Sequence, residues 1–171
     1  NLIRAIKLVN QKTPLNLVLT GSKEADFSSF DAVFRLVEEL SLKDRVHFLG
    51  YVNNQQFSAI YKLAQALVMP TYFGPTNIPI LEAWLMGTPV IYSDIPGCRQ
   101  QLGPAGLLIN PDKPQDIARQ ILKLLNSAEL KRRLTKLGRE RVKQWTPKQF
   151  KDTIAQIITD FEIGEHAHPG R

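Results

Sequence analysis

Short apolar runs alternate with helical patterns along the first two-thirds of the chain. The runs are four to six residues long and bounded by Gly or Pro, which is typical of strands buried on both faces. They span residues 15–20, 46–50, 66–70, 89–92 and 106–109. Between them, apolar residues recur at helical spacing, as from Phe30 to Leu40 and from Phe57 to Ala64. Because strand and helix alternate, the pattern predicts a parallel sheet flanked by helices.

The region after the last strand is purely helical. Apolar series begin at Ile117, Leu130 and Phe150, and the third continues to Phe161. The last helix has a clear start, in which Thr146 is the N-cap, Pro147 the first helical residue and Gln149 the partner of a capping box, with Trp145 placed to pack on Phe150. An N-cap at Asn53 with Gln56 three residues later predicts a similar start for an earlier helix.

The length and the order of elements predict one domain over residues 1–161, followed by a disordered tail over 162–171. A helical pattern at Leu2, Ile6 and Val9 precedes the first strand, whereas a doubly wound sheet normally opens with a strand. We therefore expect the chain to be a fragment that lacks its opening strand and loop. Ligands of such sheets bind beyond the carboxyl ends of the strands, here residues 21–27, 50–53, 71–77 and 93–97.

Composition excludes several classes of function. The chain has one Cys and three His residues, too few for a disulfide framework or a zinc site, so we expect no metal and no cofactor. It has no apolar run near the roughly 18 residues that would span a bilayer. The formal charge of +6 is concentrated in residues 113–151. That stretch is interpreted as a solvated helix face, or as a contact for an anionic membrane surface or a partner; nucleic acid is not expected, because aromatic residues are not interleaved with the charges.

The segment from Pro70 to Asp94 carries the candidate chemistry. It predicts a short helix over residues 78–86, capped by Asn77, with Pro79 in the first turn and Gly87 followed by a proline at its end. The N-terminus of such a helix favours an anion, commonly phosphate. Glu82, one turn further in, could accept hydrogen bonds from hydroxyl groups of the same ligand, or could simply pair favourably with the helix dipole.

The same segment resembles the retaining GT-B-fold glycosyltransferases, also called group 1 glycosyl transferases. Their Pro-Ser, Leu-Glu-Ala and Gly-Thr-Pro-Val-Ile motifs are matched in register by residues 70–71, 81–83 and 87–91. Residues 46–52, 106–111 and the opening Asn1-Leu-Ile-Arg-Ala-Ile are also similar, so the resemblance covers about residues 1–161. It implies the C-terminal donor-binding half of a GT-B fold, a three-layer α/β/α Rossmann-like parallel sheet with C-terminal helices.

The resemblance also implies a donor-binding site. Glu82 matches the second acid of the family's paired-Glu motif, which implies hydrogen bonds to the donor's ribose hydroxyls. Asn77, Ile78 and Pro79 occupy the turn that lies against the donor phosphates or sugar. Because Pro79 has no backbone N–H, the amides must come from its two neighbours. Residues Tyr51 and Val52 lie where the family holds the nucleotide base.

One position departs from the family pattern. The first acid of the motif falls on Gly74, so its direct role near the donor sugar cannot transfer. Either Thr76 or Asn77 compensates, or the sugar is recognised differently, or the protein is a weak or inactive member. The family's diphosphate-binding Arg and Lys have no clear match either, since Arg4 and Lys23 are poorly placed. No catalytic residue is therefore identified.

These observations predict a metal-independent hexosyltransferase domain that binds a UDP- or GDP-linked hexose. Transfer would need an N-terminal acceptor domain of the same full-length chain, so the fragment alone is expected to be inactive. The resemblance is compatible with polysaccharide or glycolipid biosynthesis, in the cytoplasm or at the inner face of the membrane. Two alternatives stay open: a non-catalytic nucleotide-sugar-binding module or degenerate subunit, and a nucleotide-sugar epimerase of the same architecture.

Overall fold

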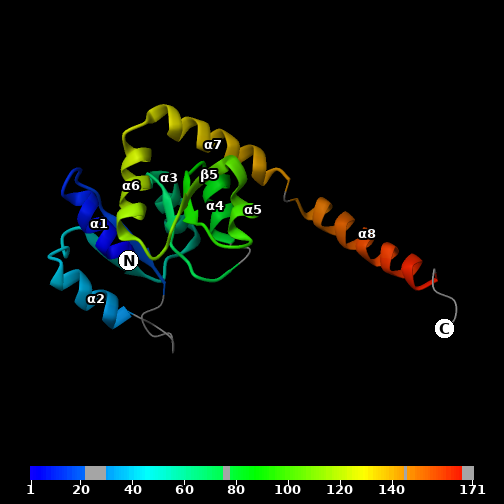
Figure 1. Ribbon diagram of the computed structural model, residues 1–171, viewed down its shortest axis with the longest axis horizontal. Coiled ribbons are helices and arrows are strands. Elements are labelled where there is room, and N and C mark those ends of the chain that lie inside the picture. Colours follow the sequence, from blue (N-terminus) through cyan, green and yellow to red (C-terminus); the bar gives the residue numbers. More distant parts are fainter. Residues whose placement is uncertain (22–29, 75–77, 145, 167–171) are drawn as a thin grey trace.

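In the described residues, five strands alternate with helices in the order that the sequence predicts, and one short helix, α5, is added to that order. The computed structural model describes residues 1–21, 30–74, 78–144 and 146–166 (Figure 1). The strands in these parts are β1 (Leu17–Thr20), β2 (Val46–Gly50), β3 (Leu67–Met69), β4 (Val90–Ser93) and β5 (Gly106–Ile109). The helices are α1 (Leu2–Asn10), α2 (Phe30–Glu39), α3 (Asn54–Leu63), α4 (Ile78–Met86), α5 (Cys98–Leu102), the 3-10 turn η1 (Gly103–Ala105), α6 (Pro114–Leu125), α7 (Ala128–Val142) and α8 (Pro147–His166).

Every strand pair is parallel, as predicted from the alternation of strands and helices. Strand β4 lies between β3 and β5, and β1 pairs with β2. Among the described residues no backbone ladder joins the two groups. The opening strand that is expected from the sequence is therefore not tested by these residues.

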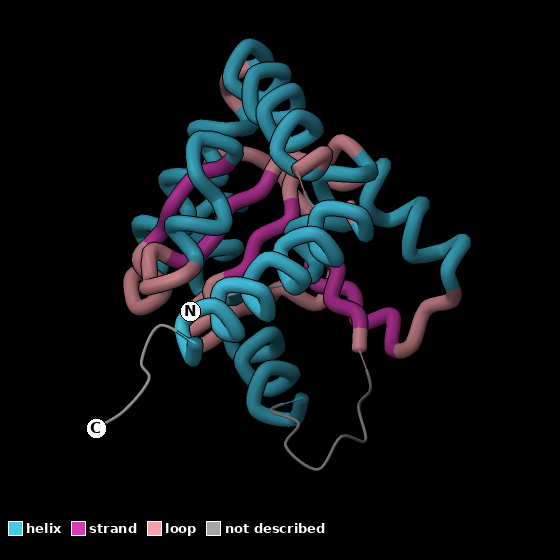
Figure 2. Tube along the Cα trace, turned by 90° about the vertical axis from the view of Figure 1, so that its right-hand side faces the viewer, coloured by secondary structure: helices cyan, strands magenta, loops and turns pink. Residues whose placement is uncertain are grey.

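Strand β4 is completely buried, and its two faces belong to different parts of the core. Val90 and Tyr92 pack with residues of α3, α4 and α5, whereas Ile91 packs with residues of α1, α2 and α6. Both groups are apolar, and full burial of a side chain such as Val or Ile stabilises the folded state by roughly 1.5–3 kcal/mol. The strands thus form the middle layer between two helical layers (Figure 2), which confirms the predicted three-layer architecture.

The predicted helix starts are confirmed where the structure describes them. The Asn53 side chain accepts from the amides of Gln55 and Gln56, and the Gln56 side chain accepts from the Asn53 amide. At the start of α8, Gln149 and Thr146 exchange the same pair of bonds, both at 3.1 Å. Trp145, the proposed packing partner of Phe150, lies outside the described residues.

Two details of local structure differ from the sequence predictions. The sequence pattern indicates no helix between residues 93 and 106, but the fully buried Cys98 begins the short helix α5. The tail was expected to begin at residue 162, but α8 continues to His166. Apolar periodicity shows only which part of a helix has side chains that can pack on a neighbour. Backbone hydrogen bonds can continue the helix beyond the last such side chain. Residues 167–171 lie outside the described residues.

Helix α7 crosses α4 at Trp84. The indole ring is buried, and its N–H donates to the carbonyl of Ala105 at 3.3 Å. It lies against the backbone of Gly138, where an added Cβ would be 2.2 Å from the Cδ1 atom of the indole. Gly138 therefore allows the close approach of α7 to α4.

We expect Gly138→Ala to destabilise the fold although it improves helix propensity. Alanine gains about 1 kcal/mol over glycine inside a helix. The added methyl group displaces a buried indole, and overpacking of this kind costs about 1–3 kcal/mol, so the net loss should be up to roughly 2 kcal/mol. The free energy of unfolding measured in urea checks the sign.

The double variant Gly138→Ala/Trp84→Phe provides the control. A smaller ring leaves room for the methyl group, so Gly138→Ala should cost less in this background, or even stabilise the protein. If Gly138→Ala stabilises the otherwise unchanged chain, the indole does not restrict this position.

Candidate functional site

The loops at the carboxyl ends of the parallel strands are described only in part. Residues 22–29 after β1 lie outside the described residues, as do 75–77 before α4. The predicted site residues Thr76 and Asn77 therefore have no structural account. The other predicted site residues are described and come from the loops after β2 and β3 and from α4.

Helix α4 has the bounds that the sequence predicts, and it carries Glu82 in its second turn. The side chain is half-buried against α3. The hydroxyl group of Tyr61, on α3, lies 3.3 Å from Glu82 Oε2 and 3.4 Å from the carbonyl oxygen of Pro79. Among the described residues no hydrogen bond to Glu82 Oε1 is found, so this oxygen can accept one from a ligand.

Tyr61 is itself held from several sides. Its ring packs edge-on against Phe57, with 4.8 Å between the ring centroids, and the Thr88 hydroxyl donates to its carbonyl oxygen at 2.6 Å. Burial raises the pKa of the Tyr61 phenol, and the charge of Glu82 and the hydrogen bond to it raise that pKa further. The hydroxyl is thus protonated at neutral pH and fixes the Glu82 carboxylate by donating to it. This partner was missed at the sequence level.

Gly74, in the position of the family's first acid, is held through its backbone. Its carbonyl oxygen accepts from the Tyr92 hydroxyl at 3.1 Å and from Cys98 Sγ at 3.4 Å. Its φ angle is +114°, which L-residues rarely adopt. The departure from the family motif therefore involves the backbone of the loop as well as the missing carboxylate.

The start of the same loop is hydrogen-bonded to the turn that follows β5 and to the first residue. The Tyr72 hydroxyl oxygen lies 3.2 Å from the carbonyl oxygen of Pro111 and 2.9 Å from Asp112 Oδ1. It accepts a hydrogen bond from the Asn1 side-chain amide at 3.0 Å. The hydrogen bond to the carboxylate raises the pKa of Tyr72. This network connects residues more than a hundred positions apart, so no local pattern could have revealed it.

Tyr51 and Val52 follow β2 at the same edge of the sheet. The Tyr51 side chain is 90 % exposed, and Val52 is half-buried just before the cap of α3. No hydrogen bond joins the described side chains of Tyr51 and Glu82. An exposed aromatic ring at this edge can stack on a planar ligand, while Ile78 and Pro79 begin α4.

The charged groups described near the site are already paired in part. Beyond β4, Arg99 donates two hydrogen bonds to Asp94, at 2.9 and 2.7 Å, so this cation is already paired. In the described parts of the chain no three His, Cys, Asp or Glu side chains gather as metal ligands would. None of the described helices is both long and apolar enough to span a bilayer. The arrangement offers hydrogen-bond acceptors, a helix N-terminus and an aromatic ring, which suit a polyhydroxylated anionic ligand.

Curated relatives of the chain are glycosyltransferases. The chain is 28 % identical over 164 residues to the O-antigen chain mannosyltransferase B of Escherichia coli, which covers 95 % of the chain and 42 % of that protein. It is 31 % identical over 130 residues to the D-inositol 3-phosphate glycosyltransferase of Corynebacterium aurimucosum, which covers 73 % of the chain and 31 % of the relative. The chain thus spans less than half the length of these relatives.

Solved structures give the same result for the fold. Sucrose-phosphate synthase from Thermosynechococcus elongatus superposes with a TM-score of 0.80 and 28 % identity, over 95 % of this chain and 43 % of that one. Anabaena HepE in complex with UDP-glucose superposes with a TM-score of 0.79 over 92 % of this chain and 44 % of that one, and its 20 % identity supports the fold alone. Residues 1–141 match the family described as glycosyl transferases group 1. The chain therefore belongs to the group 1 glycosyl transferases, and it forms one Rossmann-like half of a GT-B fold.

Proposed function

We propose that this chain is the donor-binding domain of a hexosyltransferase and that it binds a UDP- or GDP-linked hexose at the carboxyl edge of its sheet. The observation that carries the proposal is the Glu82 carboxylate, fixed by Tyr61 at 3.3 Å. A carboxylate oriented in this way suits paired hydroxyl groups such as those of a ribose. The N-terminus of α4 would receive the phosphates, and Tyr51 with Val52 would hold the base.

The names of similar proteins support a nucleotide-sugar ligand. Two of the structures similar to this chain are described as complexes of Anabaena HepE with UDP-glucose and with UDP. The E. coli relative is named a mannosyltransferase, which fits a hexose as the transferred group. We propose that transfer retains the configuration of the donor sugar and needs no metal, as the family resemblance implies.

The acceptor would be bound by an N-terminal domain of the full-length chain, and the fragment alone would be inactive. Helix α8 fits such an arrangement, because it projects from the body of the domain (Figure 1) and exposes five large apolar side chains between residues 148 and 161. These are Phe150, Ile154, Ile157, Ile158 and Phe161. We propose that this stripe packs on the acceptor domain, which would remove it from water.

The lack of a side chain at Gly74 favours a second candidate, a nucleotide-sugar-binding module without transferase activity. With glycine in place of the motif's first acid, no carboxylate reaches the donor sugar from this position. A full-length protein that binds the donor but transfers nothing across a panel of acceptors would support this candidate over the first.

We expect Glu82→Gln to weaken binding of the preferred nucleotide sugar by about 10- to 100-fold. A hydrogen bond to a charged group contributes about 1.5–3 kcal/mol, and the amide offers only one acceptor oxygen. Isothermal titration of the chain with UDP, GDP and their hexose conjugates measures the effect.

Glu39→Gln is the matched control, since it makes the same change at the exposed end of α2 and should leave affinity unaltered. A 2′,3′-dideoxynucleotide should bind the unsubstituted chain and Glu82→Gln about equally. Unchanged affinity of Glu82→Gln for the ribose form would remove Glu82 from the site.

Tyr61→Phe should weaken donor binding less, by about 3- to 10-fold, because it removes one neutral donor of roughly 0.5–1.5 kcal/mol. The loss should disappear in the Glu82→Gln background and for a dideoxynucleotide, since Tyr61 acts through the carboxylate. An equal loss in all three titrations would mean that Tyr61 supports only the general packing of α3 against α4.

Gly74→Glu should destabilise the domain rather than restore the motif. A non-glycine residue held at an unfavourable φ costs about 1–3 kcal/mol. Phe73→Glu is the control, because it adds the same carboxylate one residue earlier, where the side chain is 85 % exposed and φ is not positive. Thermal unfolding measures the effect, and an equal decrease of Tm in both variants would contradict the backbone argument. Tighter donor binding by Gly74→Glu with an unchanged Tm would contradict it as well.

A further inference from the structure

Helix α7 and the residue after it contain most of the net charge of the chain. From Ala128 to Lys143 there are seven Lys and Arg residues against two Glu residues, a net charge of +5. The formal charge of the whole chain is +6. The remaining residues are therefore close to neutral, and the basic character of the protein is a property of this one segment.

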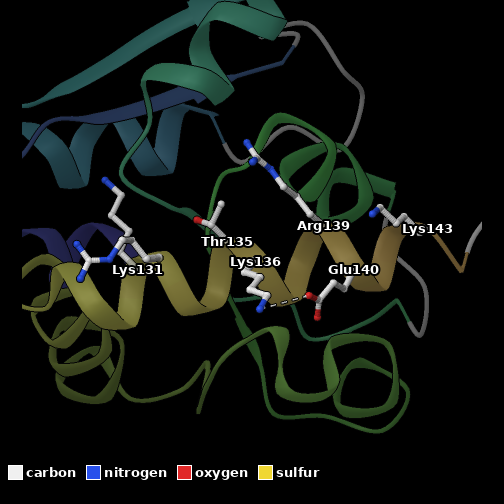
Figure 3. A pocket seen from close by; sticks show the side chains of 7 residues that line it. Lys131, Thr135, Lys136, Arg139, Glu140 and Lys143 are labelled. Carbon is white, nitrogen blue, oxygen red and sulfur yellow. Dashed lines mark ion pairs between the residues drawn. The ribbon is translucent and has the colours of Figure 1, made fainter.

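Five of these seven cations gather on one face. The buried residues face the domain: Leu134 joins the core group that includes α6, and Gly138 lies against Trp84 of α4. Cationic side chains line an open hollow of about 450 Å³ on another side of the helix (Figure 3). We call this surface the α7 groove. It is lined by Lys131, Arg132, Thr135, Lys136, Arg139, Glu140 and Lys143.

The charge of the α7 groove is weakly compensated. Lys136 approaches Glu140 at 4.0 Å, and both side chains are more than half exposed, so this pair contributes little. Within the described part of the chain, Arg132, Arg139 and Lys143 form no ion pair.

Arg141, in contrast, is a cation with a structural role. It lies off the groove and donates to the carbonyl oxygens of Gln100 and Gln101. The fold thus has a defined use for Arg141, whereas the three unpaired cations of the groove have no ionic partner in the described structure.

The groove lies at the amino edge of the sheet, away from the donor site. Lys131 donates to Gln65, which precedes β3, and Thr135 donates to the carbonyl of Gly87, which precedes β4. Glu82 and Tyr51 belong to the opposite, carboxyl edge. A large ligand bound in the groove would therefore leave the donor site open.

We propose that the α7 groove docks on an anionic phospholipid bilayer. From Lys131 to Lys143 the face is about 18 Å long at 1.5 Å per residue, which suits several headgroups better than one small anion. Its backbone amides are used inside the helix, so it lacks the cradle of N–H groups that holds a single phosphate. No aromatic side chain lines it, which disfavours a nucleic-acid strand. This proposal does not depend on the donor site.

The test is sedimentation of the whole chain with vesicles of phosphatidylcholine alone, or mixed with phosphatidylglycerol at about two to one. We expect binding to the mixed vesicles only, decreasing as salt is raised. A triple variant, Arg132→Gln/Lys136→Gln/Lys143→Gln, should lower the partition coefficient by about 100-fold, because each cation near an anionic surface contributes about fivefold. Free glycerol phosphate at millimolar concentration should not displace the protein.

The matched control is Lys7→Gln/Lys12→Gln/Lys123→Gln, which removes the same charge outside the groove and should lower binding less than threefold. Circular dichroism of both variants verifies folding, and Arg132→Lys with Arg139→Lys should preserve binding. Equal losses in the two triple variants would overturn the proposal in favour of net charge alone. Binding to pure phosphatidylcholine would overturn it in favour of the apolar stripe of α8, and displacement by RNA or by glycerol phosphate would assign the groove to another ligand.

Discussion

Burial of β4 on both faces is the constraint on which the rest of the structure depends. All four of its residues are buried, and its three apolar side chains enter two separate groups of apolar residues. A strand with no solvent-facing side needs a helical layer above and below, and parallel connections supply those helices. The same parallel arrangement brings the loops after β2, β3 and β4 to one edge, where the candidate site lies.

Helix α4 packs on this strand layer and contributes to both the candidate donor site and the α7 groove. Its first turn and Glu82 lie toward the carboxyl edge, while Trp84 anchors α7 and Gly87 at its end lies beneath Arg139. Gly87 has a φ of +77°, and an added Cβ would meet the Arg139 guanidinium at 2.6 Å. One nine-residue helix therefore positions the proposed donor contact and the floor of the α7 groove.

Local signals allowed much of the fold to be predicted, but not the contacts that complete the site. The bounds of α4 follow from a proline in its first turn and a glycine after its end, and the capping boxes follow from spacings of three residues. Tyr61 and Glu82 are 21 residues apart on different helices, so nothing in either segment announces their hydrogen bond. The short helix α5 was missed because five residues show no periodicity. The positive φ of Gly74 was hidden because glycine is compatible with almost any backbone conformation.

The separation between the two ends of α4 also limits what the α7 cations can do for the donor. Nine residues at 1.5 Å each give the helix a length of about 13 Å. This exceeds the Debye length of about 8 Å at physiological ionic strength, and the groove cations are mostly exposed to solvent, so their field at the first turn of α4 is strongly screened. The most basic surface of the chain is therefore poorly suited to neutralise the donor diphosphate. In the proposed donor complex that role falls to the amides at the start of α4 and to cations other than those of the α7 groove.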